Sequence, residues 1–399
     1  MVHDYGLLQG GAEITLCQLR QGLQAAGDEV RIFTSTAGAE RDPTTNAGRT
    51  WFADAHCRGT TSSFRTLLQS ANPWASHALR RELDRFKPDV VHLSMFLTQL
   101  SPLVLPELAG VPCVYQAHWQ RLICPKGTRV LPDGGTCHNH VGGACYSSGC
   151  LPLRDWIPLM LQHRMLQRWR GAIDRIIADS ECLRLRLTEA GYPGVDVIPP
   201  GMPEQPARPP LEGPPSVIYA GRLVREKGVN VLLDAFRLVL QRVPSAVLHI
   251  AGAGREEHSL REQAASPGLA GHVRFHGWLA DTQREQLSQW AWVQVVPSLW
   301  EEPFGLTALE AAARGTATVA SAIGGLSEIV RNGQTGFLVP PGSSEKLADA
   351  LVHLLESRDL AESMGRSAQA RARDCFSESA YVDRFRGVYQ DLVAARSAG

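Results

Sequence analysis

Two carboxylates, Glu302 and Glu310, have seven residues between them in the stretch PSLWEEPFGLTALEAAARG at 297–315. The residues at 306–313 are strong helix formers, so we expect Glu302 in the loop before a helix and Glu310 in its first turns. A helix N-terminus binds anions through its unpaired N–H groups and partial positive charge, and Gly305 permits close backbone approach. The stretch therefore suits a diphosphate held between two acceptors for sugar hydroxyls. An ordinary acidic loop before an amphipathic helix is the simpler alternative.

A second group of charged residues lies in the stretch GRLVREKG at 221–228, after a predicted strand. The carboxyl ends of parallel strands are where ligands bind, so Arg222 and Lys227 would face such a ligand. An arginine grips a phosphate with two parallel hydrogen bonds, and a lysine adds a point charge. Both would stabilise the charge that grows on a leaving diphosphate. The alternative is a solvated basic loop.

Two further motifs fall at strand ends in the first half of the chain. Gly10 and Gly11 precede a predicted helix at 12–26, where backbone N–H groups can reach an anion; a simple turn is the common alternative. His118 follows a predicted strand at 112–117. A single histidine is more often structural than catalytic, but its place at the end of a strand favours a functional role. The neighbouring residue is Trp119, which leaves the hydrogen-bond partner of the imidazole unassigned.

The motifs follow one another along the chain as Gly10-Gly11, His118, Arg222 with Lys227, and Glu302 with Glu310. In that order they resemble the retaining glycosyltransferases of family 4, which have the GT-B fold. The resemblance implies an α/β protein of two Rossmann-like domains facing a central cleft. It also implies transfer of a sugar from a nucleoside-diphosphate sugar to an acceptor hydroxyl. The implied catalytic residues are His118, Glu302, Arg222 and Lys227. The implied donor-binding residues are Gly10, Gly11, Arg222, Lys227, Trp278, Leu279, Glu302, Phe304, Gly305, Leu306, Thr307 and Glu310.

The same resemblance distributes roles among these residues. Arg222 and Lys227 would hold the diphosphate, Glu310 the ribose hydroxyls, Glu302 the donor sugar, and His118 would contact that sugar in the transition state. The chain contains no Asp-x-Asp pair, so we expect no catalytic metal and no cofactor beyond the nucleotide-sugar co-substrate. Two alternatives stay open: a sugar-nucleotide epimerase of the same fold, and a non-catalytic nucleotide-sugar-binding protein. No sequence motif identifies the acceptor; a sugar, a lipid-linked sugar or a small molecule would each fit.

Four cysteines are grouped in a glycine-rich segment after His118. They are Cys124, Cys137, Cys145 and Cys150, with 12, 7 and 4 residues between them. Four cysteines can hold a structural zinc ion, but no C-x2-C pair is present. A packed loop with reduced thiols is the favoured interpretation, and a metal centre is the alternative. The other five cysteines are scattered, which argues against a disulfide framework.

The composition is that of a globular protein, with 44% hydrophobic residues, 20% charged residues and a formal net charge of zero. Nothing in this balance favours nucleic acid as a partner. No apolar run reaches 18 residues and no signal peptide is visible, so we expect a cytoplasmic protein. A predicted helix at 152–172 carries several arginines and two tryptophans. Such a helix can lie on the surface of an anionic membrane, although a core helix with a solvated basic face is the favoured interpretation.

Short β-rich runs alternate with helical patterns, which favours two parallel sheets. Predicted strands lie at 29–34, 89–93, 112–117, 175–178, 195–198, 216–220, 246–251, 272–276, 293–296, 318–320 and 336–339. Predicted helices lie at 12–26, 75–86, 152–172, 228–243, 306–313 and 378–395. The expected domains are 1–200, a Pro-rich linker at 201–215, 216–377, and a final helix at 378–399 that crosses back to the first domain. The family resemblance implies a longer first strand than the one that ends here at His3, Asp4 and Tyr5, so we expect this strand to be truncated.

Overall fold

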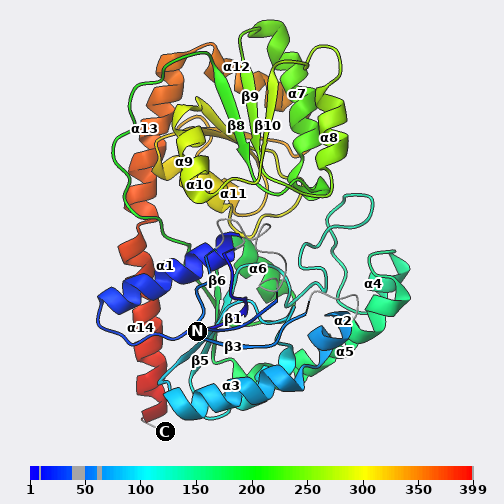
Figure 1. The fold of residues 1–399 in the computed structure, drawn as a ribbon, viewed down its shortest axis with the longest axis vertical. Helices are drawn as coiled ribbons and strands as arrows, with labels where there is room; N and C mark the ends of the chain where they lie inside the picture. The colour runs from blue at the N-terminus through cyan, green and yellow to red at the C-terminus, as the bar shows by residue number, and fades with distance from the viewer. Residues whose placement is uncertain (9, 38–49, 61–64, 398–399) are drawn as a thin grey trace. The chain divides into compact units, whose positions relative to one another are not determined.

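The computed structural model describes residues 1–8, 10–37, 50–60 and 65–397 (Figure 1). The chain forms two compact units, which are described separately. Unit 1 comprises Met1–Gly201 with Glu378–Gly399, and unit 2 comprises Met202–Ser377. Each unit is an α/β layer structure, as the alternation of strand and helix patterns predicts.

Unit 1 is built on a seven-stranded parallel sheet of order β3-β2-β1-β4-β5-β6-β7. Its strands are β1 (Val2–Tyr5), β2 (Phe33–Ser35), β3 (Ala55–Cys57), β4 (Val91–Leu93), β5 (Cys113–Ala117), β6 (Arg175–Ala178) and β7 (Val195–Val197). Its helices are α1 (Gly11–Ala25), α2 (Arg65–Ser70), α3 (Pro73–Phe86), α4 (Ala144–Ser147), α5 (Leu153–Trp169), α6 (Glu181–Glu189) and α14 (Glu378–Ser397), with short 3-10 turns η1 (Pro102–Val104), η2 (Pro106–Leu108) and η3 (Arg170–Ala172).

Two strands of unit 1 begin later than the sequence predicts. β2 begins at Phe33 instead of residue 29, and β4 at Val91 instead of residue 89. Val2 of β1 pairs with Phe33 on one side and with Leu93 on the other, and Val91 pairs with Cys113 of β5. Just before β2, the Ile32 N–H donates to the Asp54 side chain at 2.8 Å instead of to a strand. β1 itself is therefore a strand paired on both sides, and β3, which the sequence did not predict, extends the sheet at one edge.

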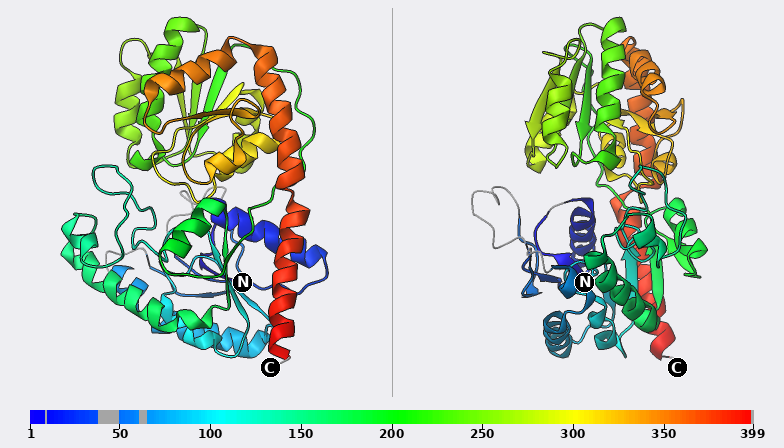
Figure 2. Two further views of the ribbon diagram at one scale, coloured as in Figure 1. Left: turned by 180° about the vertical axis from the view of Figure 1, so that it is seen from behind. Right: turned by 90° about the vertical axis from the view of Figure 1, so that its right-hand side faces the viewer.

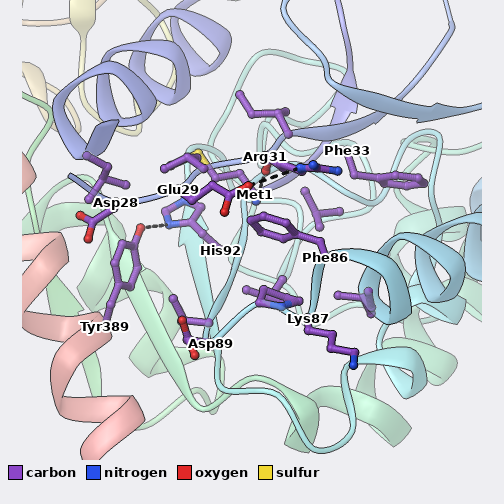
Figure 3. Close-up of a pocket in the computed structure, with 18 of the residues that line it drawn as sticks. Met1, Asp28, Glu29, Arg31, Phe33, Phe86, Lys87, Asp89, His92 and Tyr389 are labelled. Atoms are coloured by element: carbon purple, nitrogen blue, oxygen red, sulfur yellow. Dashed lines mark hydrogen bonds and ion pairs between the residues drawn. The ribbon is translucent and has the colours of Figure 1, made fainter. Parts of the chain in front are cut away.

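A cavity of about 590 Å³ opens where β1 begins (Figure 3). Phe33, Phe86, His92 and Tyr389 are among its lining residues, and the His92 Nδ1 atom lies 2.7 Å from the Tyr389 hydroxyl. The amino group of Met1 also lies here and donates to a backbone oxygen at 2.7 Å. Burial lowers the pKa of this amino group to about 5. None of the sequence-predicted site residues lines this cavity.

The last helix completes the core of unit 1. Tyr381 and Phe385 of α14 are almost fully buried and pack with Leu19 of α1 and Ile177 of β6. α1 and α14 lie side by side in both views of Figure 2. A Cβ atom on Gly22 would approach Val382 to 2.3 Å, so glycine is needed for this close contact.

Unit 2 is built on a six-stranded parallel sheet of order β10-β9-β8-β11-β12-β13. Its strands are β8 (Ser216–Ala220), β9 (Val247–Ala251), β10 (Val273–Gly277), β11 (Val293–Val296), β12 (Ala317–Ser321) and β13 (Gly336–Val339). Its helices are α7 (Val229–Arg242), α8 (Glu257–Ala264), α9 (Asp281–Trp290), α10 (Leu306–Ala313), α11 (Leu326–Ile329), α12 (Ser344–Leu355) and α13 (Arg358–Cys375), with the 3-10 turn η4 (Arg225–Lys227). The central strands β8, β11 and β12 are almost wholly buried because helices cover both faces, although polar side chains such as Gln294 and Thr318 are among their residues.

The segment expected as a Pro-rich linker belongs to unit 2. The backbone N–H of Met202 donates to the Phe376 carbonyl at 2.8 Å. Leu211 is buried in the core of unit 2, and its N–H donates to the Glu362 carboxylate at 2.8 Å. Residues 202–215 are therefore attached to unit 2 at these positions, while most of their other side chains are exposed. In the part of the chain that the structure describes, no helix has both the length and the apolar character needed to cross a bilayer.

Candidate active site

Two loops of unit 2 are held together so that Lys227 and Glu302 meet. Gly228 has φ +68°, and a Cβ atom there would come within 2.0 Å of the Pro297 carbonyl oxygen. The Leu299 N–H donates to the backbone oxygen of Glu226 at 2.9 Å. Only glycine fits where the loop after β8 crosses the loop after β11.

The Lys227 Nζ atom lies 2.6 Å from Glu302 Oε1, and the Ser298 hydroxyl donates to the same oxygen at 2.5 Å. The Glu302 side chain is 7% exposed and that of Lys227 is 20% exposed, so the pair is largely shielded from water. The ammonium group also lies 5.5 Å from the centre of the Trp300 ring. Because a buried carboxylate is stable only when paired, Glu302 and Lys227 act as one ion pair rather than as two independent groups.

The backbone before α10 is enclosed by glycines that the sequence reading did not single out. A Cβ atom on Gly324 would lie 2.4 Å from the Glu302 carbonyl oxygen, and one on Gly325 would lie 2.5 Å from the Phe304 Cα atom. Gly305 is the N-cap residue of α10, with φ +113°. Gly305, Leu306 and Thr307 remain partly exposed, so the first turn of α10 can meet a ligand. The consecutive glycines at 324–325, directly after a strand, were the signal in the sequence.

Phe304, a predicted donor-binding residue, has a buried side chain. Its side chain is 3% exposed, packs in the apolar core beside α13, and lies edge-on to Phe376 with ring centres 5.7 Å apart. Its side chain cannot also contact a donor, so any donor contact must come from its backbone. The aromatic ring instead anchors the loop that carries Glu302.

The remaining predicted donor residues of unit 2 lie at strand ends or in α10. Glu310 is 8% exposed and lies 3.4 Å from the Arg284 guanidinium. Arg222 is exposed, and the Tyr219 hydroxyl fixes its backbone by donating to its carbonyl at 2.7 Å. Trp278 is 44% exposed and follows β10, with the partly exposed Leu279 next to it.

A glycine loop after β9 supports the Arg222 segment and was missed in the sequence. A Cβ atom on Gly252 would come within 1.8 Å of the Gly221 carbonyl oxygen, and one on Gly254 within 2.2 Å of the Leu223 carbonyl oxygen. The Leu223 N–H donates to the Ala253 oxygen at 3.0 Å. The AGAG sequence at 251–254 was the available signal.

In unit 1, His118 has an acidic partner that the sequence did not reveal. The His118 Nδ1 atom lies 2.8 Å from Asp179 Oδ2, and both side chains are 5% exposed. The parallel register explains the meeting: Ala117, the last residue of β5, pairs with Ala178, the last residue of β6, so His118 and Asp179 follow side by side. The Ser180 hydroxyl then caps α6 by accepting from the Leu183 N–H at 3.1 Å.

An ionised carboxylate only accepts hydrogen bonds, so Asp179 fixes the proton of neutral His118 on Nδ1. The Nε2 atom is buried and has no hydrogen-bond partner among the described residues. Asp179 is itself held by Gln116, whose Nε2 donates to Oδ1 at 2.8 Å. The Tyr381 hydroxyl of α14 donates to Gln116 Oε1 at 3.2 Å. The chain Tyr381–Gln116–Asp179–His118 therefore orients the imidazole and leaves Nε2 to accept from a ligand.

The glycine pair at the start of α1 differs in detail from the expectation. The N–H of Gly10 donates to Glu13 Oε2 at 2.9 Å, and Glu13 Oε1 lies 3.1 Å from His3 Nε2. The Gly10 amide, predicted to reach an anion, thus already donates to the Glu13 carboxylate at the N-terminus of α1. Gly11 lies in the first turn of α1.

The four grouped cysteines line one small cavity of about 20 Å³ in unit 1. They lie around a four-residue helix, α4, and an antiparallel bridge between Val130 and Thr136. Burial raises the pKa of Cys145 and of Cys150, which favours the neutral thiols. Among the described residues no group of three or more His, Cys, Asp or Glu is arranged to hold a metal ion. The four thiols thus surround one small cavity within a packed loop.

Models of known protein families match both units of the chain. A family model described as Glycosyltransferase Family 4 matches residues 9–205, and one described as Glycosyl transferases group 1 matches residues 202–371. The chain belongs to glycosyltransferase family 4. The family and the enzyme class predicted from the sequence are confirmed.

The relatives of this family 4 glycosyltransferase include glycogen synthase of Mycobacterium tuberculosis, with 32% identity over 299 residues, 73% of this chain and 66% of that protein. D-inositol 3-phosphate glycosyltransferase of Pseudarthrobacter chlorophenolicus is 28% identical over 397 residues, 92% of this chain and 86% of that protein.

Among solved structures, sucrose-phosphate synthase of Thermosynechococcus elongatus superposes with a TM-score of 0.75 at 24% identity, covering 98% of this chain and 96% of that one. HepE of Anabaena, solved with UDP-glucose, gives a TM-score of 0.70 at 21% identity and covers 98% of both chains. These two likenesses confirm the predicted fold class.

Proposed function

We propose that this chain transfers a sugar from a nucleoside-diphosphate sugar to an acceptor hydroxyl with retention of the anomeric configuration and without a metal ion. The observation that carries the proposal is the shielded Lys227–Glu302 pair, 2.6 Å apart, in the segment that leads into the N-terminus of α10. In the reaction the bond between the anomeric carbon and the phosphate oxygen breaks, and a bond to the acceptor oxygen forms. The proton of the acceptor hydroxyl passes to the leaving phosphate oxygen.

The leaving diphosphate needs positive charge that is already in place. Exposed Arg222, Lys227 and the N–H groups at the first turn of α10 supply it in unit 2. Their attraction grows as the bond to the sugar breaks, and only such differential stabilisation raises the rate of the chemical step. The absence of an Asp-x-Asp pair from the sequence agrees with a cationic clamp in place of a metal clamp.

The two glutamates are assigned to hydroxyl groups of the donor. Both contacts of Glu302 fall on Oε1, so Oε2 can accept from a sugar hydroxyl. Glu310, in the interior of α10, can accept from the ribose hydroxyls. Trp278 and Leu279 are assigned to the base through their backbone.

His118 is assigned to the donor sugar. Because Asp179 holds the imidazole proton on Nδ1, Nε2 would accept a hydrogen bond from a sugar hydroxyl. Its buried, unpartnered Nε2 atom supports this assignment, since such an atom costs free energy until a ligand satisfies it. Gly11 is assigned to the diphosphate through its backbone.

The donor is sought first among UDP-sugars, because HepE was solved with UDP-glucose. The acceptor panel includes inositol phosphate and glucan oligomers, since relatives are named for these classes of product. Each donor is scored by thermal shift, by hydrolysis and by transfer, and the anomeric configuration of the product is read by NMR. Epimerised sugar nucleotide with no transfer product would replace this proposal by the epimerase alternative. Binding without turnover of any kind would favour the non-catalytic one.

Variants of the clamp test the mechanism. Arg222→Ala and Lys227→Ala should each lower kcat by about 10²–10³-fold and change the donor KM far less. Arg225→Ala, an exposed residue of the same loop, is the matched control and should leave kcat near that of the parent protein. Near-normal kcat in both clamp variants would refute the assignment, and so would loss of activity in EDTA that Mg²⁺ restores.

A further inference from the structure

Helix α5 of unit 1 presents an apolar stripe to the outside. Leu153, Ile157 and Leu161 are 52%, 57% and 50% exposed. Residues four apart share one face of a helix, so the three side chains form one continuous row. Figure 1 shows α5 on the periphery of unit 1, beside α2. Exposed apolar side chains grouped in this way mark an interaction surface.

Two arginines continue the same row toward the end of α5. Arg164 lies three residues after Leu161 and Arg168 four residues after Arg164, and both are exposed. Arg154 at the start of the helix has an 86% exposed side chain. Asp155 is the one acidic residue in the sequence of α5, and Thr66 of α2 donates to it at 3.1 Å. The outward face is therefore apolar in its first half and basic in its second.

The opposite face of α5 is anchored, so the exposed row is held in a fixed orientation. Leu159, Gln162 and Leu166 are buried. Gln162 Nε2 donates to the Leu97 carbonyl at 2.9 Å, and its Oε1 accepts from buried Arg121 at 3.3 Å. The outward face of α5 is thus not required for packing within unit 1.

An aromatic residue extends the row at the N-terminal end of α5. Tyr146 of α4 is 50% exposed, and its ring centre lies 6.0 Å from that of Trp156. Trp156 is fixed because its Nε1 donates to the Gly142 carbonyl at 3.0 Å. Tyrosine and tryptophan are favoured where an apolar region meets water, because each ring carries a polar group.

We propose that the α5 surface, formed by Tyr146, Leu153, Ile157, Leu161, Arg164 and Arg168, docks on an anionic lipid bilayer with the helix lying in the plane of the interface. Charge complementarity selects this partner: the arginines meet anionic headgroups while the apolar row enters the boundary with the acyl chains. A protein partner of ordinary size buries about 800 Å² per side, more than one row of half-exposed side chains provides. The proposal is independent of the transferase chemistry.

The test is co-sedimentation of the full-length chain with phosphatidylcholine vesicles, with and without phosphatidylglycerol. We expect binding to the anionic vesicles, weakening as salt is raised because headgroup attraction is screened. Arg164→Gln and Arg168→Gln should each weaken binding about fivefold. Ile157→Ser and Leu161→Ser should weaken binding to the anionic vesicles at every salt concentration, because they remove apolar contacts that salt does not screen. Circular dichroism and thermal unfolding check that each variant is folded.

A matched control lies on α6 of the same unit. Leu185 is 47% exposed, but its basic neighbours Arg184 and Arg186 are paired with Glu181 and Glu189. Leu185→Ser should leave vesicle binding unchanged. No binding to anionic vesicles, or equal losses for Leu185→Ser and Leu161→Ser, would overturn the proposal. A concentration-dependent dimer abolished by Leu161→Ser, without lipid binding, would assign the surface to a second copy of the chain instead.

Discussion

Replacing Asp179 by asparagine should reverse the hydrogen-bonding role of His118 without altering the size of the side chain. Gln116 Nε2 donates to Oδ1 of Asp179, so an asparagine must direct its oxygen toward Gln116. Its amide nitrogen then faces His118 Nδ1 and donates to it. The imidazole proton moves to Nε2, and this atom changes from an acceptor into a donor.

The expected loss follows from the contact that is inverted. The Nδ1–Oδ2 distance is 2.8 Å and both side chains are 5% exposed, so water does not screen the interaction. A hydrogen bond to a charged group contributes about 1.5–3 kcal/mol. If this stabilisation is felt in the transition state, kcat should fall by about 10- to 150-fold. The donor KM should change little, because all the proposed contacts to the base and ribose come from unit 2.

Two measurements check this reasoning. Steady-state transfer rates give kcat and KM, and the nitrogen chemical shifts of His118 report which ring nitrogen carries the proton. Asp196→Asn is the control, because Asp196 is an exposed partner of Arg175 in the same sheet. Unchanged kcat and an unchanged tautomer in Asp179→Asn would refute the assignment of Asp179. A changed tautomer with unchanged kcat would show that the Nε2 atom is not used in transfer.

Three further outcomes are expected. In chemical denaturation, Gly228→Ala should lower the free energy of unfolding by about 1–3 kcal/mol more than Gly271→Ala does. Both glycines have positive φ, but an added Cβ atom would meet a backbone oxygen at Gly228 and nothing within 4 Å at Gly271. Burial lowers the pKa of His249 from 6.5 to about 4, so its contribution to stability is complete above pH 6.5 and is lost as the pH falls toward 4. The urea midpoint should therefore drop between pH 7 and pH 5, less so in His249→Gln, while exposed His258→Gln should match the parent protein. Tyr381→Phe should lower kcat only a few-fold, because it removes a neutral bond of 3.2 Å two steps from the imidazole.

The sequence was sufficient to predict where in the fold those candidate site residues lie that belong to short motifs. Arg222, Lys227, Glu302 and Glu310 occupy loops or a helix directly after strands, and the strands of unit 2 lie within a residue of their predicted bounds. Hydrophobic runs buried on both faces give a strong signal for such strands. The predicted family and fold followed from these motifs and are confirmed.

What the sequence could not reveal depends on contacts between distant residues. Asp179 is 61 residues from His118, and only the register of β5 on β6 brings them together. Lys227 and Glu302 are 75 residues apart and had been given separate roles. Phe304 belongs to a motif that predicts donor binding. The motif does not reveal that its side chain is buried, because burial depends on packing against α13.

The discontinuous make-up of unit 1 has a consequence for how the protein is synthesised. Tyr381 and Phe385 fill a core whose other members, including Leu19 and Ile177, leave the ribosome about two hundred or more residues earlier. Domains generally fold as units during translation, at about 5–20 residues per second, so unit 2 can fold while unit 1 still lacks its last helix. During that interval, on the order of ten seconds or longer, an apolar groove of unit 1 faces the solvent and can attract chaperones or proteases. A nascent chain halted before α14 should therefore show a protease-sensitive first unit beside a resistant second one.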